Sequence, residues 1–313
     1  MSVFFTTLDQ TAFLFSFIVL GFALSRWKLI PDNSHTVLSK LENYVFVPAL
    51  VLGTFLNNFT RDQIGAAWQL LRGSLMLAFI AIALALVCVR FCTRDPYERN
   101  IFTYGLCFSN FGFMGNAVVS ALFPEIFLEY LIFTLPLWSL IYLWGVPVLL
   151  MADSAGKQAL AQRLKNFANP MFVCTLAGMA LGLAQLPIPA FFRNVVSSAG
   201  SCMSPVAMLL TGMTIARFRL EEVLRIRQVY TVTVLRLLVF PLLFLGAMTL
   251  TAFEDTFAVC ALCSLAMPLG LNTIIIPSAL GKDTKVASGM ALVSHVLSLV
   301  TIPLVFMLFD MLR

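Results

Sequence analysis

Two stretches rich in Asn, Gly and Pro interrupt long apolar segments of this 313-residue chain. The first reads Ser109-Asn-Phe-Gly-Phe-Met-Gly-Asn116, and the second reads Met267-Pro-Leu-Gly-Leu-Asn272. Glycine costs up to about 1 kcal/mol relative to alanine inside a helix, and proline removes a helical hydrogen bond. Both stretches therefore favour a broken helix. Two broken helices that cross would aim two helix N-termini at one place, which would suit an anion.

The candidate binding residues are the amides, glycines, proline and threonine of these two stretches. They are Asn110, Gly112, Gly115, Asn116, Pro268, Gly270, Asn272 and Thr273. Amide side chains offer donors and acceptors without a permanent charge that must be desolvated. A structural alternative also stands, in which the glycines serve close helix packing and both helices are only kinked.

Two ionisable side chains lie deep in apolar segments, where such groups usually face a cavity or a partner. His295 is a candidate for proton coupling because histidine changes charge between about pH 5 and 8. The alternative is a neutral ring that is hydrogen-bonded between helices. Arg236 is a candidate for gating or substrate contact, or its side chain snorkels to the cytoplasmic face.

The second apolar segment carries polar residues near its start and a proline further on. Pro48, and Pro205 in the seventh apolar segment, are each expected to bend a helix around the crossing of the two broken helices. Lys40 and Glu42 are two positions apart and do not face each other on one helix, so no ion pair between them is predicted.

Composition places all of these residues in a membrane. The chain is 60% hydrophobic and 11% charged, with a mean hydropathy of +0.94, whereas soluble proteins contain about 25% charged residues. A membrane-spanning helix needs about 20 apolar residues. We predict ten spans, at residues 8–25, 35–57, 67–92, 98–123, 126–151, 169–186, 191–216, 228–252, 256–280 and 285–310. Little chain remains outside them for a soluble catalytic or sensory domain.

Basic residues gather in alternate loops between these spans. One side collects fourteen, namely Arg26, Lys28, Arg90, Arg94, Arg99, Lys157, Arg163, Lys165, Arg217, Arg219, Arg225, Arg227, Lys282 and Lys285. The other side has Arg61, Arg72, Arg193 and Arg313. By the positive-inside rule the first side is cytoplasmic and both termini face outward. Because the charges are scattered at span ends, we expect no nucleic-acid partner, and the first span lacks the features of a removable signal peptide.

The two halves of the chain resemble each other weakly. Gly21 and Pro48 recur 157 positions later as Gly178 and Pro205, and Ser120-Ala-Leu recurs 158 positions later as Ser278-Ala-Leu. Each half holds five predicted spans, and an odd number inverts the second half. We therefore expect an all-α polytopic membrane protein with ten transmembrane helices in a 5+5 inverted repeat and broken, crossing helices 4 and 9. The repeats span residues 1–152 and 169–313, joined by a cytoplasmic link at 153–168.

The chain resembles the auxin efflux carrier family, and particularly its bacterial members described as malate or malonate permeases. The resemblance rests on ten spans with both ends outside and on three stretches, namely Asn110-Phe-Gly-Phe-Met-Gly115, Ala266-Met-Pro-Leu-Gly-Leu-Asn-Thr273 and Gly281-Lys-Asp283. It implies an elevator-like carrier with scaffold helices 1, 2, 6 and 7, transport helices 3, 4, 5, 8, 9 and 10, and a homodimer formed through the scaffold. It also implies an organic-anion site at the crossing. Many relatives have proline where this chain has Asn116.

The leading hypothesis is secondary active transport of a small carboxylate across a plasma membrane, in a bacterium the inner membrane, coupled to protons or to the membrane potential. A sodium-coupled organic-anion symporter of the bile-acid carrier type is the alternative, although no intramembrane Asp lies near either break. An intramembrane enzyme or a sensor is a third possibility. Enzymatic function is not expected, because Ser294 and His295 are adjacent on one helix and form no catalytic constellation. We expect no cofactor, no metal site and no disulfide among the seven cysteines.

Overall fold

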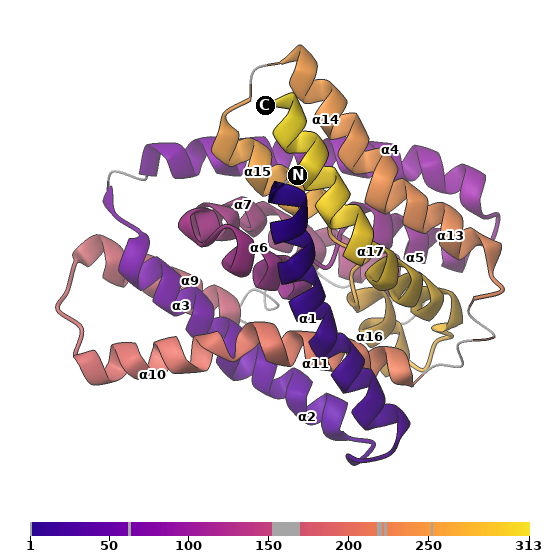
Figure 1. Cartoon of the computed structure of the whole chain (residues 1–313), viewed down its shortest axis with the longest axis horizontal. Helices are drawn as coiled ribbons and strands as arrows, with labels where there is room; N and C mark the ends of the chain where they lie inside the picture. Colours follow the sequence, from indigo (N-terminus) through magenta and orange to yellow (C-terminus); the bar gives the residue numbers. More distant parts are fainter. Residues whose placement is uncertain (1, 62–63, 152–169, 218–220, 222–223, 252) are drawn as a thin grey trace.

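The computed structural model describes residues 2–61, 64–151, 170–217, 221, 224–251 and 253–313. Every regular element within these ranges is a helix (Figure 1). The first half contains α1 (Ser2–Arg26), α2 (Ser34–Leu41), η1 (Glu42–Phe46), α3 (Val47–Asn58), α4 (Ile64–Cys92), α5 (Pro96–Cys107), η3 (Phe111–Gly115), α6 (Asn116–Leu122), η4 (Pro124–Ile126), α7 (Phe127–Leu140) and η5 (Ile141–Leu150). The second half contains α9 (Pro170–Ala184), α10 (Ala190–Ser201), α11 (Met203–Ala216), α13 (Arg227–Val234), η6 (Leu235–Val239), α14 (Phe240–Leu250), α15 (Asp255–Leu265), α16 (Asn272–Ala279) and α17 (Lys285–Leu312). The link expected at 153–168 lies outside the described residues.

Six helical stretches in the described part of the chain are long and apolar enough to cross a bilayer. They are Thr7–Arg26, Ile64–Cys92, Pro124–Leu150, Ala190–Ala216, Arg227–Leu250 and Lys285–Leu312. Three further apolar helices are shorter than the about 20 residues that a span needs, namely Phe111–Leu122, Pro170–Ala184 and Asp255–Leu265. Two of these three border the Asn- and Gly-rich stretches, so the interruptions account for their length. The chain is an integral membrane protein.

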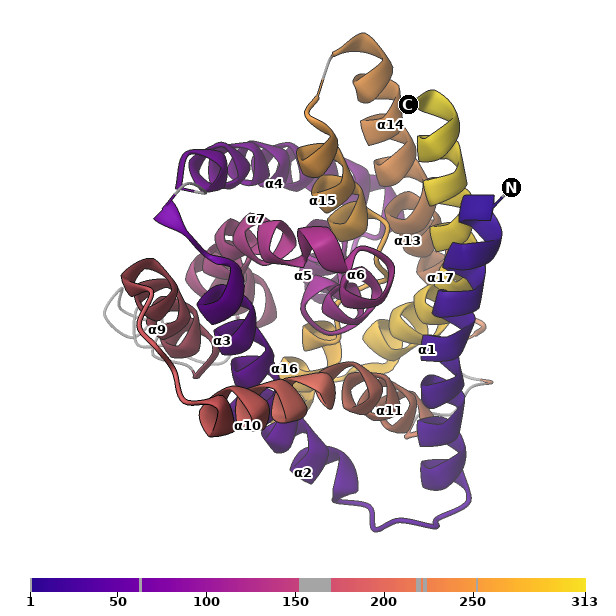
Figure 2. The same cartoon turned by 60° about the vertical axis from the view of Figure 1, so that its left-hand side comes forward.

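The helices form a ring around α5, α6 and α7 (Figures 1 and 2). On one side α1 packs along α11 and α17, and on another α3 packs against α9 and α10. A third side is formed by α4, which packs against α5 and α7. The two ends of the chain lie near each other in both views. This arrangement buries the broken helices within the protein rather than in lipid.

Glycines allow two pairs of helices in the ring to approach very closely. A Cβ atom on Gly21 of α1 would overlap the carbonyl of Leu209 in α11. A Cβ atom on Gly178 of α9 would lie 2.8 Å from the Cβ of Phe55 in α3. Close backbone approach through small residues is the common way in which membrane helices associate. Gly21 and Gly178 are a pair of glycines that the sequence comparison of the halves aligns.

Both aligned prolines follow an irregular turn. η1 is a π-helical turn, and Pro48 is buried in the first turn of α3 directly after it. Pro205 lies in the first turn of α11, after Cys202 separates α10 from α11. Proline lacks an N–H and clashes with the carbonyl four residues earlier. A π-turn or a short break removes that conflict, and such turns are frequent at functional sites.

Candidate functional site

The two Asn- and Gly-rich stretches pair with each other in the interior. α5 ends at Cys107 and α15 ends at Leu265. In the gaps that follow, the Asn110 N–H donates to the Pro268 carbonyl at 2.7 Å, and Ser109 and Leu269 form an isolated antiparallel bridge. We call these paired segments, residues 108–110 and 266–271, the crossing. Segments at least 156 residues apart in the chain (266 − 110 = 156) thus meet at one place.

Each broken helix contributes one end of each polarity to the crossing. α5 and α15 end there, so carbonyl groups without helical partners and negative dipole ends lie there. η3 and α16 begin there, so positive dipole ends lie there as well. At α16 the N–H groups of Thr273 and Ile274 donate to the Gly270 and Leu271 carbonyls of the preceding turn. The surroundings must satisfy both polarities.

Gly270 sets how closely the two segments approach. A Cβ atom at this position would lie 2.9 Å from the Phe108 carbonyl oxygen and 3.2 Å from the Ser109 carbonyl oxygen. Both neighbours are backbone atoms, which cannot move aside as a flexible side chain can. Gly270 therefore has a packing role in the crossing.

Arg236 occupies the carbonyl side of the crossing. Its side chain is 1% exposed, although η6 lies within a long apolar stretch. The guanidinium donates to the carbonyls of Leu106 at 2.9 Å, Ser264 at 2.7 Å and Met267 at 3.3 Å. The first two belong to the last turns of α5 and α15, where a positive charge complements the helix dipoles. Arg236 does not snorkel to the membrane surface but joins both broken helices.

His295 of α17 holds the Asn110 side chain. The His295 Nδ1 atom lies 2.7 Å from the carbonyl oxygen of Ala291. A carbonyl only accepts, so Nδ1 carries the hydrogen and Nε2 accepts from the Asn110 amide nitrogen at 3.0 Å. The ring is 0% exposed. The neighbouring Ser294 hydroxyl accepts the Leu269 N–H at 3.2 Å. α17 thus fixes a residue of each crossing segment, with His295 in its neutral form.

A cavity of about 300 Å³ lies beside the crossing, on the side where η3 and α16 begin. Two predicted residues, Gly112 in the first turn of η3 and Asn272 at the start of α16, contribute to its wall. The remaining lining residues are Ser39, Asn43, Tyr44, Val47, Phe113, Trp138, Tyr142, Pro170, Met171 and Ile275. None of the lining side chains is charged. The cavity therefore offers positive helix ends, amides and hydroxyls to a ligand.

Aromatic rings shape one wall of the cavity. Trp138 and Tyr142 stack with ring centroids 6.0 Å apart and an angle of 17° between the rings. A Cβ atom on Gly112 would overlap the Trp138 indole, so the ring lies directly on the η3 backbone. The Asn272 amide donates to the Tyr104 hydroxyl at 3.0 Å, which fixes its orientation.

The other predicted residues lie away from this cavity. A Cβ atom on Gly115 would overlap the Tyr130 hydroxyl, which donates to the Phe111 carbonyl at 3.0 Å. Asn116 is 3% exposed on the inner part of the same broken helix. The Thr273 hydroxyl donates to the Gly270 carbonyl at 2.8 Å and satisfies the turn before α16. These residues pack the crossing rather than line the cavity.

Several lining residues were not among the sequence candidates. Ser39 and Asn43 are four residues apart, as are Trp138 and Tyr142, and residues at this spacing share one helix face. A polar pair and an aromatic pair on single faces of otherwise apolar segments were the available signals. Aromatic residues in membrane spans are so common at lipid interfaces that the second signal was weak.

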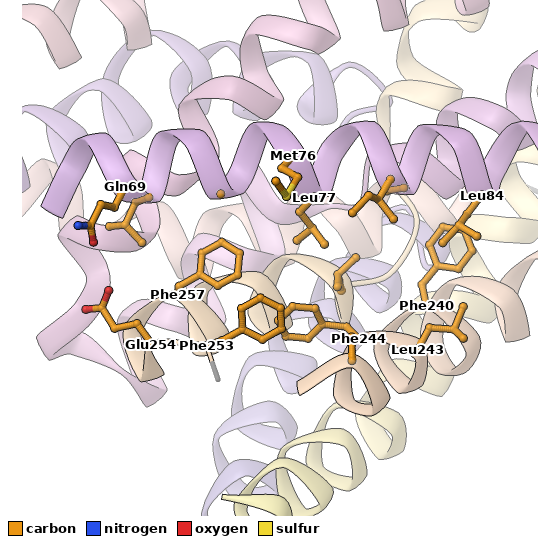
Figure 3. Close-up of a pocket in the computed structure, with 16 residues that line it drawn as sticks. Gln69, Met76, Leu77, Leu84, Phe240, Leu243, Phe244, Phe253, Glu254 and Phe257 are labelled. Carbon is orange, nitrogen blue, oxygen red and sulfur yellow. The ribbon is translucent and has the colours of Figure 1, made fainter. Parts of the chain in front are cut away.

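A groove of about 380 Å³ lies on a different face (Figure 3). It lies between α4 on one side and α14 and α15 on the other. Phe253, Phe257 and Phe244 lie opposite Met76 and Leu77 in Figure 3, and its walls are almost entirely apolar. Leu75, Phe79 and Ile80 of α4 are exposed beside it, so the groove opens toward lipid. Its chemistry suits acyl chains and does not suit a polar substrate.

Metal-binding clusters are absent from the described residues, where no group of three His, Cys, Asp or Glu side chains comes together. The cysteines at 88, 92, 107, 174, 202, 260 and 263 are free thiols.

Comparison with known proteins was consistent with this geometry. A family model described as "Membrane transport protein" matches residues 6–306. The match begins in α1, ends in α17 and includes both segments of the crossing. A search of the curated proteins gave no match.

Proposed function

Because this chain belongs to the membrane transport protein family, we propose that it is a secondary active transporter of a small organic anion, with carboxylates as the substrate class. Membership of the family agrees with the resemblance drawn from the sequence, and the family consists of transporters rather than enzymes. The observation that carries the proposal is that Gly112 and Asn272, from the first turns of two broken helices, line one cavity.

The polarity of the cavity supports an anion. Helix N-termini bind carboxylates and phosphates through free N–H groups and the positive dipole end. Arg236, the buried cation, is directed to three carbonyls on the other side of the crossing. The substrate would therefore be held by dipoles and amides. This suits release as well as binding, because no full charge pair has to be broken. A volume of about 300 Å³ suits a small molecule.

The position of the cavity supports an elevator-like mechanism. Ser39 and Asn43 come from α2 and η1 in the second predicted span, and Met171 comes from α9 in the sixth. We propose that these two spans belong to a scaffold of spans 1, 2, 6 and 7. Gly112 of η3 and Asn272 of α16 lie in the fourth and ninth predicted spans. We propose that these two spans move together with spans 3, 5, 8 and 10. A binding site at the boundary of two such units would be carried across the membrane when one unit slides past the other.

The matched glycine contacts support an inverted repeat. Gly21 lets α1 of the first span approach α11 of the seventh, and Gly178 lets α9 of the sixth span approach α3 of the second. These contacts exchange under the offset between the halves, as a two-fold relation requires. We propose five-helix repeats at 1–152 and 169–313, outward-facing termini, a homodimer formed through the scaffold, and a bacterial inner membrane as the location. A reporter fused within 153–168 is expected to be cytoplasmic, and an external signal there would overturn the orientation.

Counterflow in proteoliposomes tests the transport function. Vesicles loaded with one carboxylate should take up a labelled carboxylate without ATP, and a panel of mono- and dicarboxylates would identify the substrate. Asn272→Ala should lower the apparent affinity about 5- to 10-fold, because about 1 kcal/mol of hydrogen bonding is lost. Asn58→Ala, an exposed amide on α3, is the matched control.

The outcomes separate the alternatives. Absence of counterflow with every carboxylate would refute the proposed substrate class. Counterflow that requires sodium would favour a symporter of the bile-acid carrier type. Equal affinities of Asn272→Ala and the control would remove the cavity from the binding site.

A further inference from the structure

Glu42 is a buried carboxylate that has no partner. It is the first residue of the η1 turn and is 0% exposed. Neither of its carboxylate oxygens has a hydrogen-bond partner. Arg236 provides the contrast, because it is equally buried but donates to three carbonyls. Glu42 is therefore buried without hydrogen-bond partners, whereas Arg236 is buried with three.

The helices around Glu42 supply no compensating charge. η1 packs against α9, α10 and α11 and is continuous with α2 and α3. Besides Glu42, the titratable side chains on these helices are Tyr44 on η1, which is exposed, His35 and Lys40 on α2, Cys174 on α9 and Arg193 on α10. Lys40 and Arg193 are exposed, and His35 contacts Arg217 and the Asp32 carbonyl. No hydrogen bond or ion pair in the described part of the chain joins any of them to Glu42.

An ionised carboxylate in this environment would be very costly. Burying an unpaired charge costs many kcal/mol, and in practice such a group is neutralised instead. Glu42 is therefore protonated in this conformation. Acidic side chains within membrane spans usually mark ion or proton pathways, and π-turns inside helices are frequent at functional sites.

Glu42 lies at the boundary on which the proposed movement depends. Asn43 and Tyr44 of the same turn line the substrate cavity. α11 packs against η1 and also against η3, which begins the first broken helix. η3 belongs to the unit that we propose moves, so its displacement would open or close the cavity wall at Asn43 and Tyr44, which follow Glu42 in the same turn.

We propose that Glu42 is a proton-binding site that couples proton movement to the transport of the anion. Its carboxylate takes a proton from water on one side of the membrane, forming an O–H bond, and returns that proton to water on the other side. The inference rests on the proposed function and adds the group that carries the coupling ion. The sequence offers His295 as a candidate for this role, with a neutral ring that is hydrogen-bonded between helices as the alternative. The ring contacts instead suit a neutral histidine that positions Asn110, because protonation would place two N–H donors face to face.

Two transport assays on the same proteoliposomes separate the coupling from transport itself. Counterflow at equal pH on both sides measures exchange, and accumulation under a pH gradient, with the membrane potential clamped at zero, measures coupling. One pH unit supplies about a tenfold accumulation per proton carried. The wild type should accumulate about tenfold, whereas Glu42→Gln should keep counterflow and accumulate none. Glu42→Asp, which retains a carboxyl group, should keep both activities, and whatever counterflow His295→Gln retains should still be driven to accumulation by the pH gradient.

Each of the other possible results would contradict either the role of Glu42 or the transport function. Wild-type counterflow without proton-driven accumulation would overturn the proposal for Glu42 and leave the transport function standing, whereas absence of counterflow in the wild type would refute the transport function. Accumulation by Glu42→Gln, or loss of accumulation in a His295→Gln protein that retains counterflow, would overturn the assignment to Glu42. So would a folded Glu42→Gln protein that has lost counterflow.

A chemical probe tests the protonated state in the wild type, whether or not a variant folds. Dicyclohexylcarbodiimide reacts with protonated carboxyl groups in apolar surroundings. We expect peptide mass spectrometry to find Glu42 modified at neutral pH and to find the modification lost in Glu42→Gln. An unmodified Glu42 would overturn its protonated state and with it the proposal.

Discussion

The two segments of the crossing are held in place by opposite means. In the first, residues 108–110, a side chain does the holding, because the Asn110 amide bonds to His295. In the second, residues 266–271, the backbone is held, since Arg236 bonds to the Met267 carbonyl and Ser294 to the Leu269 N–H. Where the sequence has a proline, neighbouring helices satisfy the freed backbone groups. Where it has an asparagine instead, the side chain itself reaches a neighbour.

The largest effect is expected from Arg236, which joins both segments. Arg236→Gln would remove the charged donor to the buried Leu106 carbonyl of α5 and would leave the Ser264 carbonyl of α15 with the Ser109 hydroxyl alone. Each hydrogen bond to a charged group contributes about 1.5–3 kcal/mol. The variant should show a large drop in Tm in detergent and little transport. Arg193→Gln, an exposed site on α10, serves as the control. If Tm were unchanged, the two segments would not depend on the shared cation.

Gly270 is expected to come next, because its neighbours are backbone atoms. Gly270→Ala would push the Phe108 and Ser109 carbonyls away from their present positions, and overpacking of this kind costs about 1–3 kcal/mol. Gly246→Ala on α14, where an added Cβ meets nothing within 4 Å, should leave the Tm unchanged. Similar melting curves for both variants would show that the crossing can relax at little cost.

Asn110→Ala should affect the first segment alone. It removes the donor to His295 Nε2, and leaving a buried acceptor unpaired costs about 1–3 kcal/mol. Loss of transport with a smaller drop in Tm than that of Gly270→Ala is the expected pattern. Asn110→Asp tests the same contact further, because an ionised carboxylate only accepts hydrogen bonds and would need a protonated His295 Nε2 as its donor. Full transport in Asn110→Ala would show that the first segment needs no side-chain anchor.

The smallest effect should come from Ser294, which contributes one neutral contact to the second segment. Ser294→Ala removes the acceptor of the Leu269 N–H at a cost of about 1 kcal/mol. We expect a slightly lower Tm with transport retained, measured beside Ser298→Ala, whose hydroxyl bonds only to its own helix. A loss as large as that of Arg236→Gln would mean that the second segment depends on α17 more than on the cation.

The sequence indicated the crossing but not how it is satisfied. Asn, Gly and Pro in apolar segments are local signals, so the positions of both breaks could be predicted from helix energetics alone. The role of Arg236 could not, because its acceptors are backbone carbonyls of residues as far as 130 positions away. Every residue has such a carbonyl, and no residue type marks the one that will be used.

The wall of the cavity shows a second limit. Gly112 and Asn272 belong to the breaks and were candidates, whereas Trp138 and Tyr142 resemble ordinary membrane aromatics until the fold brings them beside η3. Glu42 was visible as an acidic residue near the start of a span. Only the packing of α9, α10 and α11 around it reveals that it has no partner.

The position of Trp138 allows substrate binding to be followed by tryptophan fluorescence. Its indole lies on the η3 backbone at the cavity wall, whereas Trp27 and Trp68 are exposed at 72% and 61%. The fourth tryptophan, Trp144, packs against Phe108 in the crossing. A variant with phenylalanine at 27, 68 and 144 would emit from Trp138 alone. Substrate occupancy and its dependence on pH could then be followed as a fluorescence change in detergent, without a membrane and without any flux.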